Sequence, residues 1–334
     1  MKAMVWHGPE QLSVEEVPDA EAAPGEVVLA PEAVGICGSE VEGHKVLGGA
    51  RVPPLVMGHE IAGRVVAVGE GVDAAWEGRR AAVNPLLPGP GARPGRENIS
   101  PTRRLIGIHR PGGFAAAMPV PVEALHAVPD DTDPRVAALA EPFANGLHVV
   151  GLGLDGAAPE TVERAVVLGA GALGVLVLRA ALLAGLPSVA VVEPHPERRE
   201  RALRLGAHAA FASVEEAGRE EADLTMDAVG ADATRQGALT LLRSGGRAML
   251  LGLADDVSPI AFHDVVRREL ALIGSYAYTP AEYERALDWL VSGRAALDEL
   301  AAVRPLDEGP AAFAELVRGP GSDIRVFLAA EPQA

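Results

Sequence analysis

The chain has 334 residues, a formal net charge of −17 and a single cysteine. This length favours two domains over one, and the strong negative charge disfavours nucleic acid and anionic membranes as partners. One cysteine excludes an intramolecular disulfide and any zinc site built from four cysteines.

The first 130 residues or so predict a β-rich domain. Short apolar segments at 27–34, 61–69 and 79–85 are separated by Gly and Pro turns. Residues 84–104 are dense in Pro, Gly and Arg and predict an irregular surface loop. The amino terminus lacks the basic start and apolar run of a secretory signal, and no apolar run is long enough to cross a bilayer. We therefore expect a cytoplasmic protein.

The pattern of predicted elements changes at about residue 164, from short strands to alternating strands and helices. Residues 164–194, "RAVVLGAGALGVLVLRAALLAGLPSVAVVEP", predict a strand, a glycine turn, a helix and a second strand. Helices and apolar strands continue to alternate up to about residue 276, which predicts a parallel, doubly wound sheet and an α/β fold. A helix at 280–293 then leads into a strand, helix and strand over 303–329. We expect this tail to return to the first domain.

The glycine turn predicts a dinucleotide site. Gly169, Gly171 and Gly174 have the G-x-G-x-x-G spacing, directly after a strand and at the start of a helix whose amino end attracts phosphates. Glu193 ends the second strand, where a carboxylate accepts hydrogen bonds from ribose hydroxyls and repels a 2′-phosphate. We therefore expect NAD rather than NADP. The alternative is an ordinary strand-end glutamate that faces solvent.

Further loops at the carboxyl ends of the predicted strands complete this site. Arg198 lies close to Glu193 in the sequence, and its positive charge complicates the prediction of NAD over NADP. The predicted cofactor-binding residues are Gly169, Gly171, Leu173, Gly174, Glu193, Arg198, Ala228, Val229, Leu251, Gly252 and Ser275.

The single cysteine belongs to a possible metal site. Cys37, His59, Glu60 and Glu141 offer the ligand types that zinc accepts, and a catalytic zinc needs three protein ligands and one open position. The long spacings leave two alternatives open. Cys37 is a small buried hydrophobic residue, or it is a nucleophile paired with a histidine.

Three segments together, "GICGSE", "GHEIAGRVVAVGEGV" and "LGAGALG", resemble the zinc-dependent medium-chain dehydrogenase/reductases. The segments "NPLLP", "RLIGIHRPGGFA", "ALAEPFANGLH" and "VRRELALIGSYAYTP" are most similar to the polyol branch, which includes sorbitol, galactitol-phosphate, threonine and some aminocyclitol dehydrogenases. The resemblance implies a GroES-like catalytic domain over 1–144 and 279–334, a Rossmann domain over 145–278, and a homo-oligomer, dimer or tetramer.

The resemblance also implies roles for single residues. Cys37 and His59 match zinc ligands, Glu60 matches an adjacent ligand that can exchange, and Glu141 matches the third ligand in this branch. Ser39 matches the hydroxyl that starts the proton relay, so the catalytic residues are expected to be Ser39, Cys37, His59 and Glu60. Glu40 stands where relatives usually have an aspartate that orients the ligand histidine.

Two departures from the family pattern matter. The four-cysteine lobe of many relatives is missing, so we expect one catalytic zinc and no structural zinc. Glu42 replaces a histidine of the relay, which leaves His44 or water to carry the proton away.

The expected activity is the reversible oxidation of a secondary alcohol to a ketone, with zinc and NAD. The scarcity of aromatic residues favours a polar substrate, and we expect a polyol, a cyclitol or a sugar-like alcohol. The resemblance to aminocyclitol dehydrogenases adds an aminocyclitol or aminoglycoside intermediate of antibiotic biosynthesis to the expected substrates. Two alternatives remain: a zinc-independent, NADPH-dependent quinone or enone reductase of the same fold, and a nucleotide-binding protein without catalysis.

Overall fold

A computed structural model describes residues 1–297, 300–319 and 323–330 of the chain. The chain divides into two compact units: unit 1, Met1–Glu141 with Thr279–Ala334, and unit 2, Pro142–Tyr278. Residues 298–299, 320–322 and 331–334, which belong to the tail predicted to join the first domain, lie outside the described residues.

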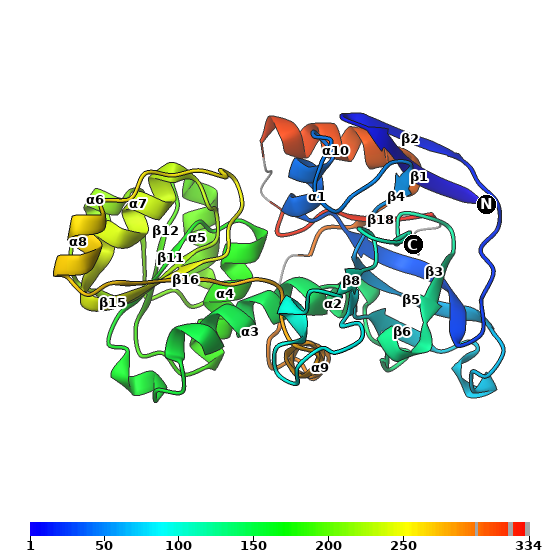
Figure 1. Ribbon diagram of the computed structural model, residues 1–334, viewed down its shortest axis with the longest axis horizontal. Helices are drawn as coiled ribbons and strands as arrows, with labels where there is room; N and C mark the ends of the chain where they lie inside the picture. The colour runs from blue at the N-terminus through cyan, green and yellow to red at the C-terminus, as the bar shows by residue number, and fades with distance from the viewer. Residues whose placement is uncertain (298–299, 320–322, 331–334) are drawn as a thin grey trace. The chain divides into compact units, whose positions relative to one another are not determined.

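Unit 1 consists mainly of β-strands (Figure 1). A three-stranded sheet has the order β2-β1-β4, a larger sheet has the order β10-β6-β5-β3-β18-β17 with β9 also paired to β3, and β7 pairs with β8. The strands are β1 (Lys2–Gly8), β2 (Gln11–Glu16), β3 (Glu26–Gly35), β4 (Leu55–Val56), β5 (Glu60–Val68), β6 (Arg80–Val83), β7 (Leu86–Leu87), β8 (Arg104–Leu105), β9 (Met118–Pro121), β10 (Leu125–Ala127), β17 (Val303–Pro305) and β18 (Phe327–Ala329). The helices are α1 (Gly38–Gly43), α2 (Pro134–Ala138), α9 (Pro280–Val291) and α10 (Gly309–Arg318).

The tail returns to the first unit, as predicted. β18 pairs antiparallel with β3, with Phe327 opposite Gly35, and β17 pairs with β18. The alternating apolar residues of these strands face a core that includes Trp6, Leu29 and Phe114. The end of β3, which leads to Cys37, is therefore held by a strand from the far end of the chain.

Unit 2 contains a six-stranded sheet with the order β13-β12-β11-β14-β15-β16, in which all neighbouring strands are parallel. The strands are β11 (Ala165–Leu168), β12 (Val189–Val192), β13 (Ala209–Phe211), β14 (Ala222–Asp227), β15 (Leu242–Leu250) and β16 (Ala271–Gly274). The helices are α4 (Ala172–Leu183), α5 (Pro196–Arg204), α6 (Val214–Ala217), α7 (Asp232–Leu241) and α8 (Phe262–Arg267), and Figure 1 shows them around the sheet. The predicted doubly wound α/β fold is confirmed, and every residue of β11 and β12 is buried, as covering on both faces requires.

The boundary between the units lies within α3 (Ala140–Leu154), a helix that the sequence analysis did not predict. The segment begins with Glu141 in its first turn and continues as an apolar stretch with Gly146 and Gly153. These glycines lower helix propensity, but a side chain at Gly146 would lie 2.9 Å from the Leu176 carbonyl oxygen. Close packing against α4 therefore favours glycine there despite its cost to the helix.

The loop predicted over 84–104 is only partly irregular. Its two ends pair as β7 and β8, and a short 3-10 turn covers Glu97–Ile99. Asn84, Pro85, Leu86, Asn98 and Ser100 are buried, so the prediction of a surface loop was wrong for these five residues. None of the helices in the described part of the chain combines the length and the apolar character needed to span a membrane.

Candidate active site

Cys37 lies at the junction between β3 and α1, where it is the N-cap residue of the helix. Its backbone N–H donates to Glu40 Oε2 at 3.1 Å, and Ser39 Oγ donates to Cys37 Sγ at 3.3 Å. Both Cys37 and Ser39 remain partly exposed. The first turn of α1 therefore presents a thiol and a hydroxyl side by side, within reach of a small molecule.

His59 is oriented by Glu40, which belongs to the same helix as Ser39. Glu40 is fully buried, and its Oε1 accepts from His59 Nδ1 at 2.9 Å and from the Gly58 N–H at 2.7 Å. The glutamate side chain is therefore long enough to hold the imidazole of His59. With Nδ1 donating to Glu40, Nε2 is the ring nitrogen whose lone pair is available to a metal. Gly58 has φ +98°, a left-handed conformation that favours glycine.

Glu60 is the first residue of β5 and lies opposite Gly35 of β3. A Cβ atom at Gly35 would come within 2.1 Å of Glu60 Oε2, so the carboxylate occupies space that only a glycine leaves open. Both carboxylate oxygens are buried, and neither has a hydrogen-bond partner among the described residues. An ion pair at 3.0 Å links Glu60 Oε2 to Arg325 Nε.

The donor set of this site fits a divalent metal. One ligand atom from each of Cys37, His59 and Glu60 lies within 4.8 Å of the other two. Thiolate, imidazole and carboxylate together suit zinc, and the carboxylate oxygens without hydrogen bonds are the acceptors that a cation would satisfy. Glu141 is not part of this group, although its charge influences Glu60. Its role as a ligand stays a prediction.

Burial and neighbouring charges set the proton affinities in the site. Burial raises the pKa of Glu60 to about 7; Arg325 opposes this rise and Glu141 adds to it. Burial by itself would lower the pKa of His59, but the charge of Glu40 and contacts with Cys37 and Glu40 outweigh it and raise the pKa well above its usual value. A divalent cation would reverse both tendencies, because it favours a charged carboxylate and a neutral imidazole.

Arg325 is a site residue that the sequence analysis missed. Its side chain is 6% exposed, and Nη1 donates to the Ile36 carbonyl at 2.9 Å while Nε pairs with Glu60. It therefore ties the backbone next to Cys37 to the carboxylate of Glu60. Arg325 could have been found in the sequence as a lone arginine inside the apolar run "IRVFLA". Such a run predicts a buried strand, and a buried arginine needs an anionic partner.

His44 was one of two routes suggested for the departing proton. It is buried, with Nδ1 2.6 Å from the Val41 carbonyl oxygen, and its ring packs edge-on against Phe313 at 5.3 Å between centroids. These contacts fix the ring against α10 and leave only Nε2 for proton transfer. The route by which the proton leaves stays a prediction.

Glu40→Gln is expected to raise the dissociation constant for zinc by about 10- to 100-fold. The amide has one acceptor oxygen where the carboxylate serves three N–H donors, so at least one donor faces an NH2 group, and the negative charge that strengthens the bond to His59 is lost. Chelator competition measures the change. Glu42→Gln is the matched control, since Glu42 is an exposed glutamate of the same helix that pairs with Lys45. Equal zinc affinity in the two variants would contradict the orienting role of Glu40.

The predicted dinucleotide site lies in unit 2, where β11 turns into α4. Gly169 has φ +90°, and a Cβ atom at Gly174 would come within 1.9 Å of the Gly169 carbonyl oxygen, so the helix packs directly on the turn. A Cβ atom at Gly171, the N-cap of α4, would meet none of the described residues within 4 Å. The turn thus has the open backbone and helix amino end that suit a diphosphate.

Glu193 follows β12 and is buried, which excludes the alternative of a glutamate facing solvent. Its Oε2 accepts from the Ala170 N–H at 2.8 Å and its Oε1 from the His195 N–H at 3.0 Å. Arg198 is buried on α5, and Arg199 donates to the carbonyls of Glu193 and Pro194. Glu193 therefore fixes the glycine turn itself, in addition to any contact with a ribose.

The loops after β14, β15 and β16 follow one another along one edge of the sheet, and the loop after β14 touches this turn. The Ala228 N–H donates to the Leu168 carbonyl, and the N–H groups of Leu251 and Gly252 both donate to the Asp227 carbonyl. The Ser275 N–H donates to the Leu250 carbonyl. Val229 touches the same turn, since a Cβ at Gly169 would lie 2.4 Å from its side chain. The structure thus gathers the cofactor-binding residues predicted from these loops; Leu173 belongs to the first turn of α4.

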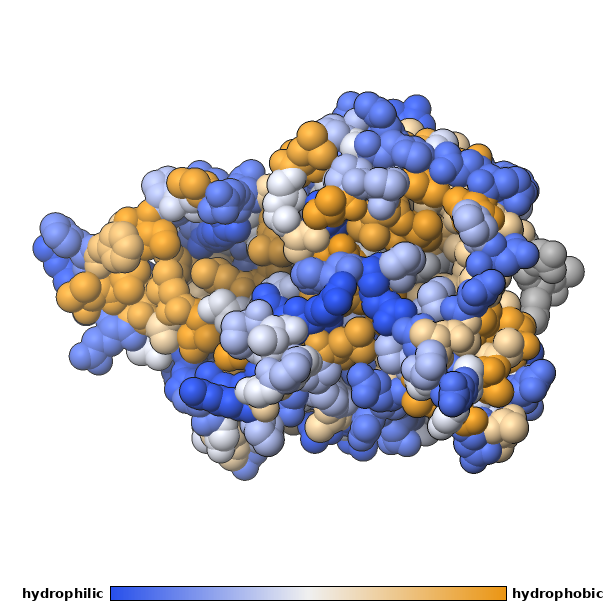
Figure 2. All heavy atoms as spheres, turned by 45° about the vertical axis from the view of Figure 1, so that its right-hand side comes forward, coloured by the Kyte–Doolittle hydropathy of each residue, from blue (hydrophilic) through white to orange (hydrophobic). Residues whose placement is uncertain are grey.

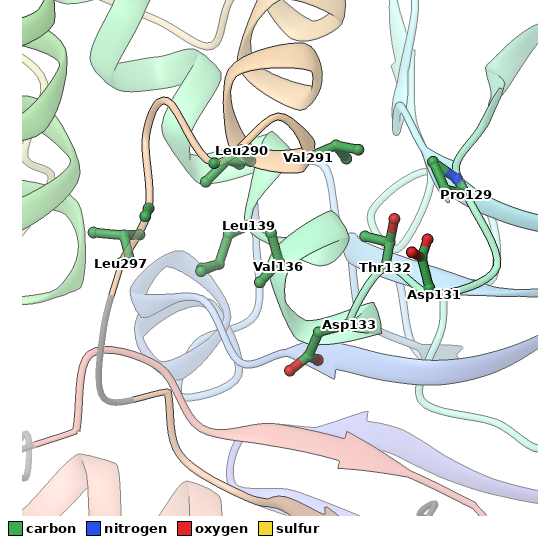
Figure 3. Close-up of a pocket in the computed structure, with 11 residues that line it drawn as sticks. Pro129, Asp131, Thr132, Asp133, Val136, Leu139, Leu290, Val291 and Leu297 are labelled. Atoms are coloured by element: carbon green, nitrogen blue, oxygen red, sulfur yellow. The ribbon is translucent and has the colours of Figure 1, made fainter.

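A separate hollow of about 500 Å³ lies in unit 1, beside α2 and the end of α9 (Figure 3). Figure 3 shows the aliphatic side chains of Val136, Leu139 and Leu290 gathered there, with Asp131 and Asp133 at one side. None of the predicted catalytic, metal or cofactor residues lines this hollow, so it is distinct from the candidate site.

Comparisons with known proteins agree with both halves of this description. Residues 23–130 match the family model of the alcohol dehydrogenase GroES-like domain, and residues 172–292 match that of zinc-binding dehydrogenases. D-altritol 5-dehydrogenase of Agrobacterium fabrum is 32% identical over 272 residues, 78% of this chain and 80% of the relative. Sorbitol dehydrogenase of Macaca fascicularis is 29% identical over 349 residues, 99% of this chain and 96% of the relative.

Two solved structures resemble the chain over nearly its whole length. The alcohol dehydrogenase RspB of Escherichia coli CFT073, in complex with NADH, has a TM-score of 0.87 at 27% identity and covers 98% of this chain and 99% of its own. A zinc-binding dehydrogenase of Sinorhizobium meliloti 1021, bound to NADP, has a TM-score of 0.89 at 28% identity and covers 98% of both chains.

Proposed function

The chain belongs to the zinc-type medium-chain alcohol dehydrogenases, polyol dehydrogenase-like, and we propose that it interconverts a secondary hydroxyl group of a polyol, cyclitol or sugar-like substrate and the corresponding ketone, with NAD. It is an NAD(P)-dependent alcohol or polyol dehydrogenase. The observation that carries the proposal is the convergence of Cys37, His59 and Glu60 beside the Ser39 hydroxyl.

Cys37, His59 and Glu60 would hold the catalytic zinc, with Glu141 near enough to influence Glu60 electrostatically. Zinc bound there supplies Lewis-acid stabilisation for the negative charge that develops on an alcohol oxygen, and NAD supplies the hydride acceptor. The protein contributes orientation. Glu40 keeps Nδ1 of His59 protonated, and Arg325 keeps Glu60 in place.

Ser39 is the group that would accept the substrate's hydroxyl proton. It shares the first turn of α1 with Cys37, and its hydroxyl lies 3.3 Å from the sulfur. Because Ser39 is partly exposed while His59 and Glu60 are buried, an alcohol would approach the donor cluster from the side of Cys37 and Ser39. The proton would pass from Ser39 to water.

Two observations support a polar substrate. D-altritol and sorbitol, the substrates in the names of two relatives, are polyols. Most of the few aromatic side chains of this chain are already used in the cores, among them Trp6, Tyr278, Tyr283, Phe114 and Phe313. The proposed substrate class includes an aminocyclitol or an aminoglycoside intermediate, because an aminocyclitol is a cyclitol that carries an amino group.

A substrate panel tests the proposed function. Zinc-loaded protein is offered polyols, cyclitols, aminosugars and simple alcohols with NAD, and NADH absorbance is followed, with chelated protein as the control. We expect polar secondary alcohols to be oxidised only by the zinc-loaded form. Equal turnover after chelation would favour the zinc-independent reductase, and no turnover with any alcohol would favour a nucleotide-binding protein without catalysis.

Glu193→Ala is expected to raise the dissociation constant for NAD about tenfold, because it removes the proposed ribose acceptor, the hydrogen bond from the Ala170 N–H that fixes the glycine turn and the hydrogen bond from the His195 N–H that fixes the loop after β12. At saturating NAD, kcat should change little, since the chemistry occurs elsewhere. Glu197→Ala, an exposed glutamate in the next helix, is the control. NAD binding is measured by titration in parallel with NADP. Unchanged NAD binding in Glu193→Ala would contradict the proposed role and the proposed preference for NAD.

A homo-oligomer, dimer or tetramer, is part of the proposal, together with the cytoplasmic location expected above. β16 is an edge strand of the sheet in unit 2. The exposed residues Leu253, Val257, Phe262 and Val266 give the same unit an apolar surface, and Figure 2 shows hydrophobic residues gathered on its visible face. A monomer seldom exposes an unpaired edge and apolar residues together.

A further inference from the structure

We propose that Arg51 recognises an anionic group, a phosphate monoester or a carboxylate, on the substrate of this enzyme. The inference rests on the proposed function, because it assigns a specificity residue to the same site. It narrows the substrate class from polar alcohols in general to alcohols that carry a negative charge.

The first observation is an unsatisfied guanidinium. Nε and Nη2 of Arg51 are both buried, and neither has a hydrogen-bond partner among the described residues. Leaving charged donors buried without acceptors is costly. The chain contains 46 acidic residues against 29 basic ones, yet it places none of the described carboxylates on these two nitrogens. An exogenous anion that gained access to Nε and Nη2 would satisfy both of them as a bidentate partner.

The second observation is the position of the guanidinium against α1. A Cβ atom at Gly43, the last residue of α1, would lie 2.5 Å from Arg51 Nη1 and 3.1 Å from its central carbon. Six residues of helix rise by about 9 Å, so the charge lies roughly that far along the helix from Cys37. Ala50 and Val52 line an open hollow of about 770 Å³, whereas Arg51 between them is not among its lining residues. Its side chain turns instead towards the helix that carries Cys37 and Ser39.

Glu40 is the nearest competing explanation, because its charge and that of Arg51 interact. However, the two oxygens of Glu40 already accept from Cys37 N–H, Gly58 N–H and His59 Nδ1. His59 supplies the stronger compensating charge for this carboxylate. Arg51 is therefore not needed as its hydrogen-bond partner.

Arg51 is one of three arginines whose charges act on His109. Burial first, and then the charges of Arg104, Arg103 and Arg51, lower the pKa of His109. Three guanidinium groups thus act on one imidazole in a protein that is strongly acidic overall. A local positive potential of this kind attracts an anion and favours its binding over that of the neutral analogue.

Matched substrates test the proposal. Zinc-loaded wild-type protein, Arg51→Gln, Arg51→Lys and the control Arg79→Gln are assayed with sorbitol, its 6-phosphate and a hexonate. Arg79 is an exposed arginine of unit 1 that stacks on Trp76. We expect kcat/KM for one anionic substrate to exceed that for sorbitol, and this ratio to fall about 10- to 100-fold in Arg51→Gln, less in Arg51→Lys and not in Arg79→Gln. The phosphate and the hexonate arms distinguish the two sources of negative charge.

A binding measurement separates this inference from the proposed function. Inorganic phosphate should raise the Tm of wild-type protein, zinc-loaded or chelated, and this shift should be lost in Arg51→Gln but kept in Arg79→Gln. If no alcohol is oxidised, the proposed function fails while the phosphate shift still tests Arg51. The inference is overturned if Arg51→Gln keeps the phosphate shift, if it keeps the ratio of anionic to neutral substrate, or if it lowers kcat equally for all substrates.

Discussion

Cys37→Ala is expected to lose zinc and to lower kcat/KM for alcohol oxidation by at least about 10³-fold. The thiolate is one of three donors that converge within 4.8 Å, and Cys37 is the only cysteine in the chain. Without it, an imidazole and a carboxylate remain, which is one protein ligand fewer than a catalytic zinc requires. The loss in rate follows because Lewis-acid stabilisation of a developing alkoxide contributes several kcal/mol.

Metal analysis, NADH absorbance and NAD titration measure the three consequences separately. NAD binding should be retained, since the glycine turn belongs to unit 2. Ser39→Ala is the matched variant: it removes the hydroxyl next to the sulfur but no metal ligand, so it should keep zinc and still lose turnover. Full alcohol oxidation by Cys37→Ala would refute the proposed site. Loss of zinc from Ser39→Ala would show that the hydroxyl has a structural role instead.

Arg325→Met is expected to reduce the free energy of unfolding by about 3–5 kcal/mol in chelated protein. Removing the guanidinium leaves Glu60 buried without its counter-charge, beside the further negative charge of Glu141. It also removes the donor to the Ile36 carbonyl, next to Cys37. Zinc loading should recover part of this loss, because a divalent cation beside Glu60 compensates the same charge.

Urea unfolding of chelated and zinc-loaded forms measures this effect. Arg304→Met is the matched control, since Arg304 forms an exposed ion pair with Glu315 at 2.8 Å and its removal should cost less than about 1 kcal/mol. The double variant Arg325→Met, Glu60→Gln should regain most of the stability, because no buried charge is left unpaired. A double variant as unstable as Arg325→Met alone would show that the arginine acts through packing and not through Glu60.

Much of the fold could be predicted because its signals are local. The apolar strands and the glycine spacing of residues 164–194 lie within one short stretch, and the structure forms β11, α4 and β12 there. Helix α3 was missed for the opposite reason. Its glycines weaken the local helix signal, and packing of Gly146 against α4 outweighs that weakness.

The metal-ligand residues of the candidate site could be predicted from the sequence, but the charged side chains that pair with them could not. Cys37, His59 and Glu60 were identified by residue type and by resemblance, and the structure brings their ligand atoms together. Glu141 was expected beside them, but it remains outside this group of donors. Arg325 and Arg51 were not identified, because nothing in their own segments indicates which charges they face.

The sequence by itself determined the two kinds of domain, the dinucleotide turn and the ligand types of a metal site, because periodicity, glycine spacing and side-chain chemistry are properties of neighbouring residues. Only the tertiary structure decided that Glu40 binds His59 and that Glu60 packs over Gly35. It also decided that Arg325 binds the carbonyl of Ile36, 289 positions away in the chain. The physical reason is that burial and charge pairing depend on which segments meet in space. A buried carboxylate is stabilised by whatever donor or cation the fold places next to it, regardless of the distance along the chain.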